Sequence, residues 1–284
     1  MAPGEAKYYP TQLETFVECP FKYRCSKDPE IKRKHRKPTA QQYLGTCIHD
    51  ALEVFFDIRR TAVSARTAEK LADLFRRAWA GVDLPPWKKR DRVDERQKVF
   101  GGDRELEGSW GRQGLHLLDR FFRTADRTVI PYTAEQFHEA KLSSGAILAG
   151  KVDRIDKLPD GTLEVVDYKT GKPPPRQDDD SVAEEDLQLS AYAIVVGRKY
   201  GLSVSRCSLI FLSEDRKIGF TPTADLLATK EARIEEIVRS IEAEKDFAPR
   251  KNNLCPWCEY REICPVGKDI PPADRVAERP DVPF

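Results

Sequence analysis

Two alternating segments on either side of a short turn constrain the fold of this chain more than any other feature. Residues 146–158 and 162–169 alternate between polar and apolar side chains, and a Pro-Asp-Gly sequence separates them. Alternation with a period of two is typical of strands that bury one face. If the turn has three residues, Leu158 pairs with Thr162, and Gly161 takes the left-handed conformation that usually ends such a turn. The sequence therefore predicts an antiparallel hairpin.

Charged side chains lie on one face of this predicted hairpin. Asp167 and Lys169 are two residues apart on the second strand, so they project from the same face. A three-residue turn also places Asp153 of the first strand opposite Asp167, whereas a two-residue turn would separate the two carboxylates. Charges on a half-apolar face need partners, and a divalent cation is a suitable partner for carboxylates. The alternative is a pair of surface acids with a salt-bridging lysine, since these residue types are mostly exposed.

The rest of the chain predicts an α/β fold in which helices flank a mixed sheet and a helical section lies on the N-terminal side. Strand-like patterns begin at about Tyr132 and include two further strands at about 204–212 and 217–222. The expected helices are a short one after a Thr11–Glu14 capping box, 39–60 capped by Thr39, 67–80, 105–125, 184–200, and 223–245 capped by Thr223. The polar stretch between the helices at 67–80 and 105–125 is expected to be a loop.

Five segments are expected along the chain. They are an N-terminal segment with a basic arm (1–38), a helical section (39–131), a core that contains the sheet (132–247), a cysteine segment (248–268) and an extended or disordered tail (269–284). The apolar runs are far shorter than the roughly 18 residues of a membrane span, and the first residues have no signal-peptide core. A cytoplasmic location without membrane contact is therefore expected. No GxxxxGK(S/T) phosphate loop occurs, so the chain has no ATP motor of that type.

Basic residues cluster although the chain as a whole is nearly neutral. It has 48 basic and 47 acidic residues, so the net charge of +1 indicates little about partners. One cluster covers residues 87–98, and the other is a basic arm formed by Lys32, Arg33, Lys34, Arg36 and Lys37. Such clusters are typical of phosphate binding, although most charge runs are solvated faces. The basic arm is therefore a candidate DNA-binding element.

Two residue pairs with helical spacing are further candidates. His49 lies beside an apolar stripe of its predicted helix, and Glu53 shares its face four residues later. Gln188 and Tyr192 are likewise four residues apart on a later helix. Taken singly, such a histidine is more often a packed, hydrogen-bonded residue than a ligand, and such a tyrosine more often caps a buried helix face.

The order of these motifs resembles the PD-(D/E)XK nuclease superfamily and, within it, the RecB-like branch. HDALE, GKVDRID, VVDYKTG and QLSAY follow one another between residues 45 and 192. The resemblance implies a restriction-endonuclease-like core and Mg²⁺ or Mn²⁺ bound by His49, Asp153 and Asp167, with the backbone carbonyl of Tyr168 as a further ligand. Glu139 matches an acid that some members place one strand earlier.

The same resemblance assigns roles to three further residues. Lys169, two residues after the third-motif acid, is the catalytic lysine, and Gln188 and Tyr192 form the QxxxY motif that flanks the site. These two would contact the DNA backbone or orient Lys169. The third-motif acid is Asp rather than the commoner Glu, which the family allows. The resemblance thus implies a metal-dependent deoxyribonuclease.

The cysteines give an independent indication of a metal site. There are seven, an odd number that argues against a disulfide framework. Cys255, Cys258 and Cys264 form a CxxC followed by five residues and a third cysteine, and Cys19 is the best candidate for the fourth ligand, with Cys25 in reserve. Both tetrahedral zinc and a cubane iron–sulfur cluster take four ligands. The spacing alone fits either.

The cysteine spacing resembles that of the four-cysteine iron–sulfur nucleases, such as AddB-type helicase-nuclease subunits and CRISPR-associated nucleases. In them a 4Fe–4S cluster joins the N-terminal segment to the C-terminal one around the nuclease core. The resemblance implies such a cluster here. Cys47 and Cys207 lie at apolar positions and are expected to be small buried side chains.

Together these features predict a metal-dependent DNA nuclease, namely a single-strand-preferring exonuclease of DNA repair, recombination or CRISPR-type processing, with a helicase or another DNA-processing protein as partner. Trp87, Trp257 or Tyr43 would stack on unpaired bases, although each is more often a core or interface residue. One rival function is a catalytically idle DNA-binding module stapled by a metal. The other is a redox iron–sulfur protein, a function that explains the cysteines but not His49 and the hairpin acids.

Overall fold

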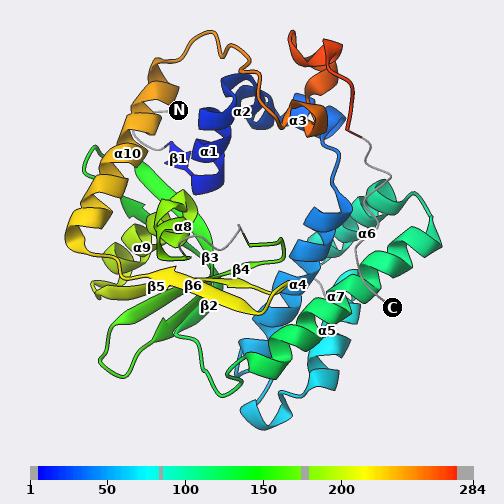
Figure 1. Cartoon of the computed structure of the whole chain (residues 1–284), viewed down its shortest axis with the longest axis vertical. Helices are drawn as coiled ribbons and strands as arrows, with labels where there is room; N and C mark the ends of the chain where they lie inside the picture. Colours follow the sequence, from blue (N-terminus) through cyan, green and yellow to red (C-terminus); the bar gives the residue numbers. More distant parts are fainter. Residues whose placement is uncertain (1–5, 83–85, 174–178, 274–284) are drawn as a thin grey trace.

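The computed structural model describes residues 6–82, 86–173 and 179–273, and these contain one mixed sheet of six strands (Figure 1). The strands are β1 (Lys7–Tyr8), β2 (Thr133–Lys141), β3 (Ile147–Lys157), β4 (Leu163–Lys169), β5 (Val204–Phe211) and β6 (Arg216–Phe220). Their order is β1-β3-β4-β5-β6, and β2 also pairs with β3. β3 is antiparallel to β2 and β4, whereas β4 and β5 are parallel and therefore need a crossover. The α/β fold predicted from the sequence is confirmed.

The central hairpin has the predicted register. The Leu158 amide donates to the Thr162 carbonyl, and Gly161 has a φ of 86°, in the left-handed region that favours glycine. Arg154 then pairs with Val166, which places Asp153 opposite Asp167 one position further along the strands. The three-residue turn therefore brings the two carboxylates together.

Helices cover both faces of the sheet. They are α1 (Pro10–Glu18), α2 (Pro20–Lys27), α3 (Pro29–His35), α4 (Ala40–Phe56), α5 (Ala68–Ala80), α6 (Pro86–Phe100), α7 (Arg104–Thr124), α8 (Asp179–Glu185), α9 (Leu187–Tyr200) and α10 (Ala224–Ala243), with short 3₁₀ turns at Val63–Ala65, Cys255–Trp257, Arg261–Ile263 and Gly267–Asp269. Val165 of β4 packs in one core cluster with α9, and its neighbour Val166 packs on the opposite face with α4, α5 and α7. The alternation along β4 thus joins two helical layers.

Several helix boundaries differ from those expected. The Thr11–Glu14 capping box does not form, because α1 begins at Pro10, whose missing amide suits a first turn. Thr39 does form a capping box, with Gln42 as its partner, but α4 ends at Phe56 rather than near residue 60. Thr67 and Thr223 cap α5 and α10.

The expected loop between α5 and α7 is wrong, because this stretch forms α6. The guanidinium of Arg92 packs inward, 2.7 Å from Asp50 and 2.7 Å from the Cys47 sulfur of α4. Apart from Phe100 at the end of the helix, the buried residue among those described in α6 is charged, so apolar periodicity gives little signal for this helix. The expected helix at 184–200 is likewise split at Asp186, whose side chain accepts a hydrogen bond from the Leu189 amide and caps α9.

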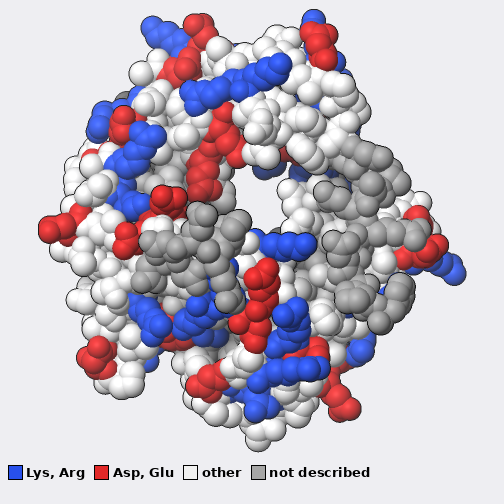
Figure 2. Space-filling view, in the orientation of Figure 1, with Lys and Arg blue, Asp and Glu red and all other residues white. Residues whose placement is uncertain are grey.

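The elements enclose an open centre. Figure 1 shows the sheet, α1, α3 and α4 arranged around it, and Figure 2 shows an opening through the molecule with acidic and basic side chains on its rim. None of the described helices is long and apolar enough to cross a membrane. The predicted tail lies outside the described residues from position 274 onward.

Candidate active site

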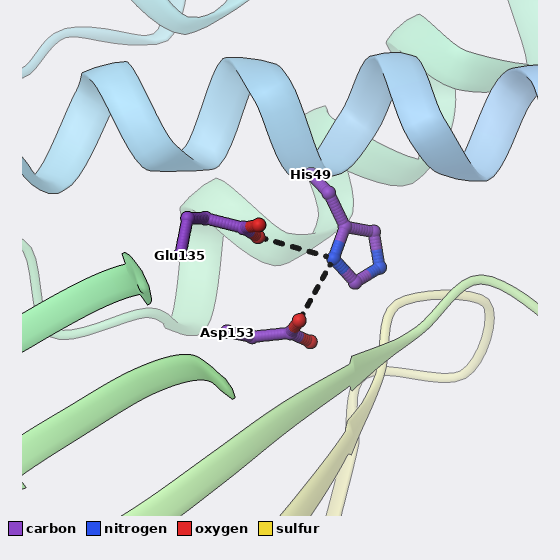
Figure 3. Close-up of side chains that lie close together, drawn as sticks. All are labelled: His49, Glu135 and Asp153. Carbon is purple, nitrogen blue, oxygen red and sulfur yellow. Dashed lines mark hydrogen bonds and ion pairs between the residues drawn. The ribbon is translucent and has the colours of Figure 1, made fainter. Parts of the chain in front are cut away.

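Three side chains from three elements meet beside the hairpin. His49 of α4, Glu135 of β2 and Asp153 of β3 each offer one ligand atom, and these atoms lie within 4.8 Å of one another. His49 Nδ1 is 3.3 Å from a carboxylate oxygen of Glu135 and 3.3 Å from one of Asp153 (Figure 3). An imidazole and two carboxylates form a donor set that suits a divalent metal ion.

The hairpin fixes the position of Asp153. Its second carboxylate oxygen accepts a hydrogen bond of 2.8 Å from the Tyr168 backbone amide, so the carboxylate bridges β4 and His49. Burial alone would lower the pKa of His49, but Asp153 and Glu135 raise it well above its ordinary value. A protonated imidazole must lose its proton before it can bind a metal, so metal affinity at this site falls at low pH.

Asp167 is almost completely buried beside Asp153. Burial and then the Asp153 charge raise the pKa of Asp167 to about 7, even though the ammonium of Lys169 lies 2.7 Å away and opposes the shift. Burial and the repulsion between the two carboxylates therefore outweigh the attraction of Lys169. A divalent cation would offset this repulsion, and the carboxylates present fit such an ion.

Lys169 is held by several partners on α9 and β4. Besides Asp167, its ammonium lies 3.3 Å from the Gln188 side-chain oxygen and 3.7 Å from Asp186. Burial lowers the pKa of Lys169, but Asp167 and Asp186 outweigh this effect and keep the pKa above its usual value. Lys169 is therefore a fixed positive charge at the site.

Gln188 and Tyr192 form a hydrogen-bonded chain behind this lysine. The Gln188 amide donates to the Tyr192 hydroxyl at 2.8 Å, while its oxygen accepts from Lys169. A Cβ at Gly150 of β3 would lie only 2.4 Å from the Tyr192 ring, so the glycine allows the ring to pack against the strand. The pair thus connects Lys169 to α9 through two hydrogen bonds.

Glu135 is the acid that sequence reasoning missed. The neighbouring pairs Ala134–Arg154 and Gln136–Val152 place it across from Asp153, and its φ of 52° is rare for a residue with a side chain. Burial would raise its pKa, but His49 and Lys151 lower it. Only the β2–β3 register could have revealed it.

Two other acids lie elsewhere than expected. Glu139, which matched the family acid one strand earlier, instead pairs with Lys7 at the protein surface. It is therefore not one of the three grouped residues, whereas Glu135 is. Glu53 shares the helix with His49 but points towards Arg60, 4.0 Å away, and is not one of the three grouped residues.

The predicted cysteine ligands converge at the junction of the N- and C-terminal segments. Cys19, Cys255, Cys258 and Cys264 line one cavity. The Cys19 sulfur accepts from the Arg250 amide at 3.4 Å, and the Cys255 sulfur accepts from the Asn252 amide at 3.3 Å. Tertiary structure thus joins residues far apart in sequence.

The remaining three cysteines are buried. Burial raises the pKa of the Cys25 thiol to about 11, and the nearby Cys258 and Cys264 add to this shift. Cys25 therefore lies close to the cysteine cavity but is not among its lining residues. Cys47 and Cys207 are buried in the core, as predicted.

The five residues of the basic arm differ in their position and in their ion pairs. Lys32, Arg33 and Lys34 lie on α3, whereas Arg36 and Lys37 follow it. Arg36 pairs with Glu95 at 3.2 Å, and Lys37 pairs with Glu262 at 2.7 Å.

The three aromatic candidates for base stacking differ in exposure. Tyr43 is buried and donates to the Trp79 carbonyl, so the expectation that it stacks on bases is wrong. Trp257 is half exposed, whereas the side chain of Trp87 lies outside the described residues.

This fold and site define a nuclease class that the family comparison also identifies. A model of the PD-(D/E)XK nuclease superfamily matches residues 10–265, and the chain belongs to this superfamily. The chain is 26% identical to the Gene 69 protein of Mycobacterium phage D29 over 278 residues, which cover 91% of this chain and 96% of the phage protein. It is also similar to the solved structure of SSO0001, with 15% identity, a TM-score of 0.42 and coverage of 93% of this chain and 88% of that one.

Proposed function

We propose that this nuclease is a Mg²⁺- or Mn²⁺-dependent exonuclease that prefers single-stranded DNA. The observation that carries the proposal is the contact of His49 with both Glu135 and Asp153, next to the buried Asp167–Lys169 pair. We take the opening bordered by charged side chains as the path of the DNA strand (Figure 2).

The chain's own residues would divide the work of hydrolysis. His49, Glu135, Asp153 and Asp167 would hold one or two metal ions, together with the Tyr168 carbonyl. When bound, the metal neutralises phosphate charge and makes water a better nucleophile at neutral pH.

Lys169 would position the attacking water or stabilise charge on the phosphate. Gln188 holds the Lys169 ammonium in place, and Tyr192 holds Gln188. A lysine fixed before substrate arrives loses little entropy on reaching the reactive geometry.

Digestion of labelled DNA tests this proposal. Linear single strands should be degraded from an end with Mn²⁺, circular single strands should persist, and Asp153→Ala should lose cleavage while remaining folded. Near wild-type cleavage by Asp153→Ala would refute the site, and cleavage of circles would refute exonuclease action. A wild-type protein that binds DNA without cutting it would be the idle binding module.

We also propose that Cys19, Cys255, Cys258 and Cys264 hold a 4Fe–4S cluster. These four side chains line one cavity, which supports a shared metal site. Four cysteine ligands suit zinc as well as a cubane, and the resemblance of their spacing to that of the iron–sulfur nucleases favours the cluster. Iron, sulfide and zinc analysis after anaerobic purification decides between them, because stoichiometric zinc without sulfide would make this a zinc site.

The cellular role follows as a further part of the proposal. The basic arm would contact DNA phosphates, and a helicase or another DNA-processing protein in the cytoplasm would supply the single strand for repair, recombination or CRISPR-type processing. A pull-down with a tailed duplex, with and without the arm charges, tests the DNA contact.

A further inference from the structure

A groove combines positive charge with an exposed indole, away from the metal ligands. It lies between α3 and the first turn of α4 on one side and α6 and α7 on the other, and its volume is about 530 Å³. We call it the Trp257 groove. Its basic lining residues and its indole are Arg33, Lys34, Arg36, Lys37, Lys98 and Trp257.

The charge of the Trp257 groove favours a polyanion. Five cations line it, and no acidic residue is among the described lining residues. Glu95 and Glu262 pair with Arg36 and Lys37 from outside that lining. Among the described residues, no carboxylate oxygen lies within 4 Å of the charged group of Arg33, Lys34 or Lys98. The charge of these three side chains therefore remains available to phosphates.

The aromatic part of the groove favours unpaired bases. Trp257 has 51% of its surface exposed, although buried Trp110 and the side chains of Val99 and Leu106 line the same groove. A flat indole next to several cations is the combination with which proteins hold single strands, because every base has a face that stacks. The bases of a duplex are already stacked on one another and offer no such face.

The groove lies next to the end of β4, the strand that carries Asp167 and Lys169. Gln41 lines it, and the Gln41 side-chain nitrogen lies 3.6 Å from where a Cβ would stand at Gly171, two residues after Lys169. Gln41 also precedes His49 by eight residues on α4, which is about 12 Å along the helix axis. A strand held in the groove can therefore reach the metal ligands within a few nucleotides.

We propose that the Trp257 groove is a binding subsite for single-stranded DNA, in which the indole stacks on an unpaired base and the surrounding cations hold the adjoining phosphates. The inference rests on the proposed nuclease function and adds where the strand is held. Trp257 lies between Cys255 and Cys258, in the 3₁₀ turn Cys255–Trp257. The cysteine site therefore sets the position of the stacking residue as well as joining the chain ends.

Anisotropy of labelled oligonucleotides bound to the full chain in EDTA tests this subsite without cleavage. Trp257→Leu should weaken binding of a thymidine 20-mer by about fivefold or more, the loss expected when one base–aromatic stack is removed. An abasic 20-mer of equal charge should bind both proteins within twofold, and Trp257→Phe should recover most of the affinity. Phe137→Ala removes an exposed ring on β2, 72% accessible, and should change nothing.

Separate readouts distinguish failure of the subsite from failure of the nuclease. Iron content and melting temperature show whether the Trp257 variants keep the cysteine site, and hydrolysis of bis(4-nitrophenyl) phosphate with Mn²⁺ reports the metal site alone. Unchanged hydrolysis with weaker oligonucleotide binding supports the subsite. An equal loss with the abasic strand, tighter binding of duplex, or displacement of DNA by polyglutamate as effectively as by single strands would overturn it. If the wild type binds DNA in a Trp257-dependent manner but hydrolyses nothing, the proposed nuclease function is refuted and the proposed subsite stands.

Discussion

Replacing Asp167 by Asn should stabilise the metal-free protein at alkaline pH. The buried carboxyl has its pKa raised from 3.8 to about 7 by burial and by Asp153, so its ionised form costs folding energy. A raised pKa contributes stability that is fully present below pH 3.8 and is lost as the pH rises through 7. The variant has no proton to lose and escapes this cost.

The expected size follows from the shift. A difference of about three pKa units at about 1.4 kcal/mol each gives a ceiling of about 4 kcal/mol at pH 8. The variant also loses the ion pair with Lys169, so a net gain of about 1–2 kcal/mol is expected. For a domain approaching this size, that gain raises the melting temperature by roughly 2–8 °C.

Calorimetry in EDTA at pH 5 and pH 8 measures the effect. The melting temperature of Asp167→Asn should exceed that of wild type by much more at pH 8 than at pH 5. Asp119→Asn, which changes an exposed acid paired with Arg123, serves as the charge-matched control and should show no such difference. Saturating Mn²⁺ should raise the melting temperature of the wild type more than that of the variant. A pH-independent difference, or a less stable variant at pH 8, would refute the electrostatic reasoning.

Three further changes test other parts of the structure. Cys258→Ala should give colourless, protease-sensitive protein, because loss of a crosslink between distant segments costs up to roughly 5 kcal/mol, whereas Cys207→Ala should stay folded and brown; absorbance and limited proteolysis measure both. Charge reversal across Lys32 to Lys37 should weaken DNA binding and flatten its salt dependence in titrations at several salt concentrations; an unchanged slope would remove the basic arm from the interface. Gly150→Ala should cost about 1–3 kcal/mol in denaturant unfolding and lower kcat, because its Cβ would stand 2.4 Å from the Tyr192 ring; a neutral result would show that the ring has room to move.

Local sequence patterns were sufficient to predict the hairpin and the acids that it carries. Strand alternation and the turn glycine are local properties, so the register that sets Asp153 opposite Asp167 could be predicted without any tertiary contact. The spacing of Gln188 and Tyr192 on one helix face is equally local, and the two side chains do meet.

The residues that complete the site from other elements could not be predicted from local patterns. Glu135 joins the site because β2 pairs with β3 and because its own φ is positive. Asp186 lies near Lys169 at the start of α9, where the apolar pattern of the sequence predicts one uninterrupted helix. Arg92 makes α6 part of the core through a buried ion pair that apolar patterning does not register. In each case the deciding contact joins residues on different elements, and a one-dimensional pattern carries no information about such distances.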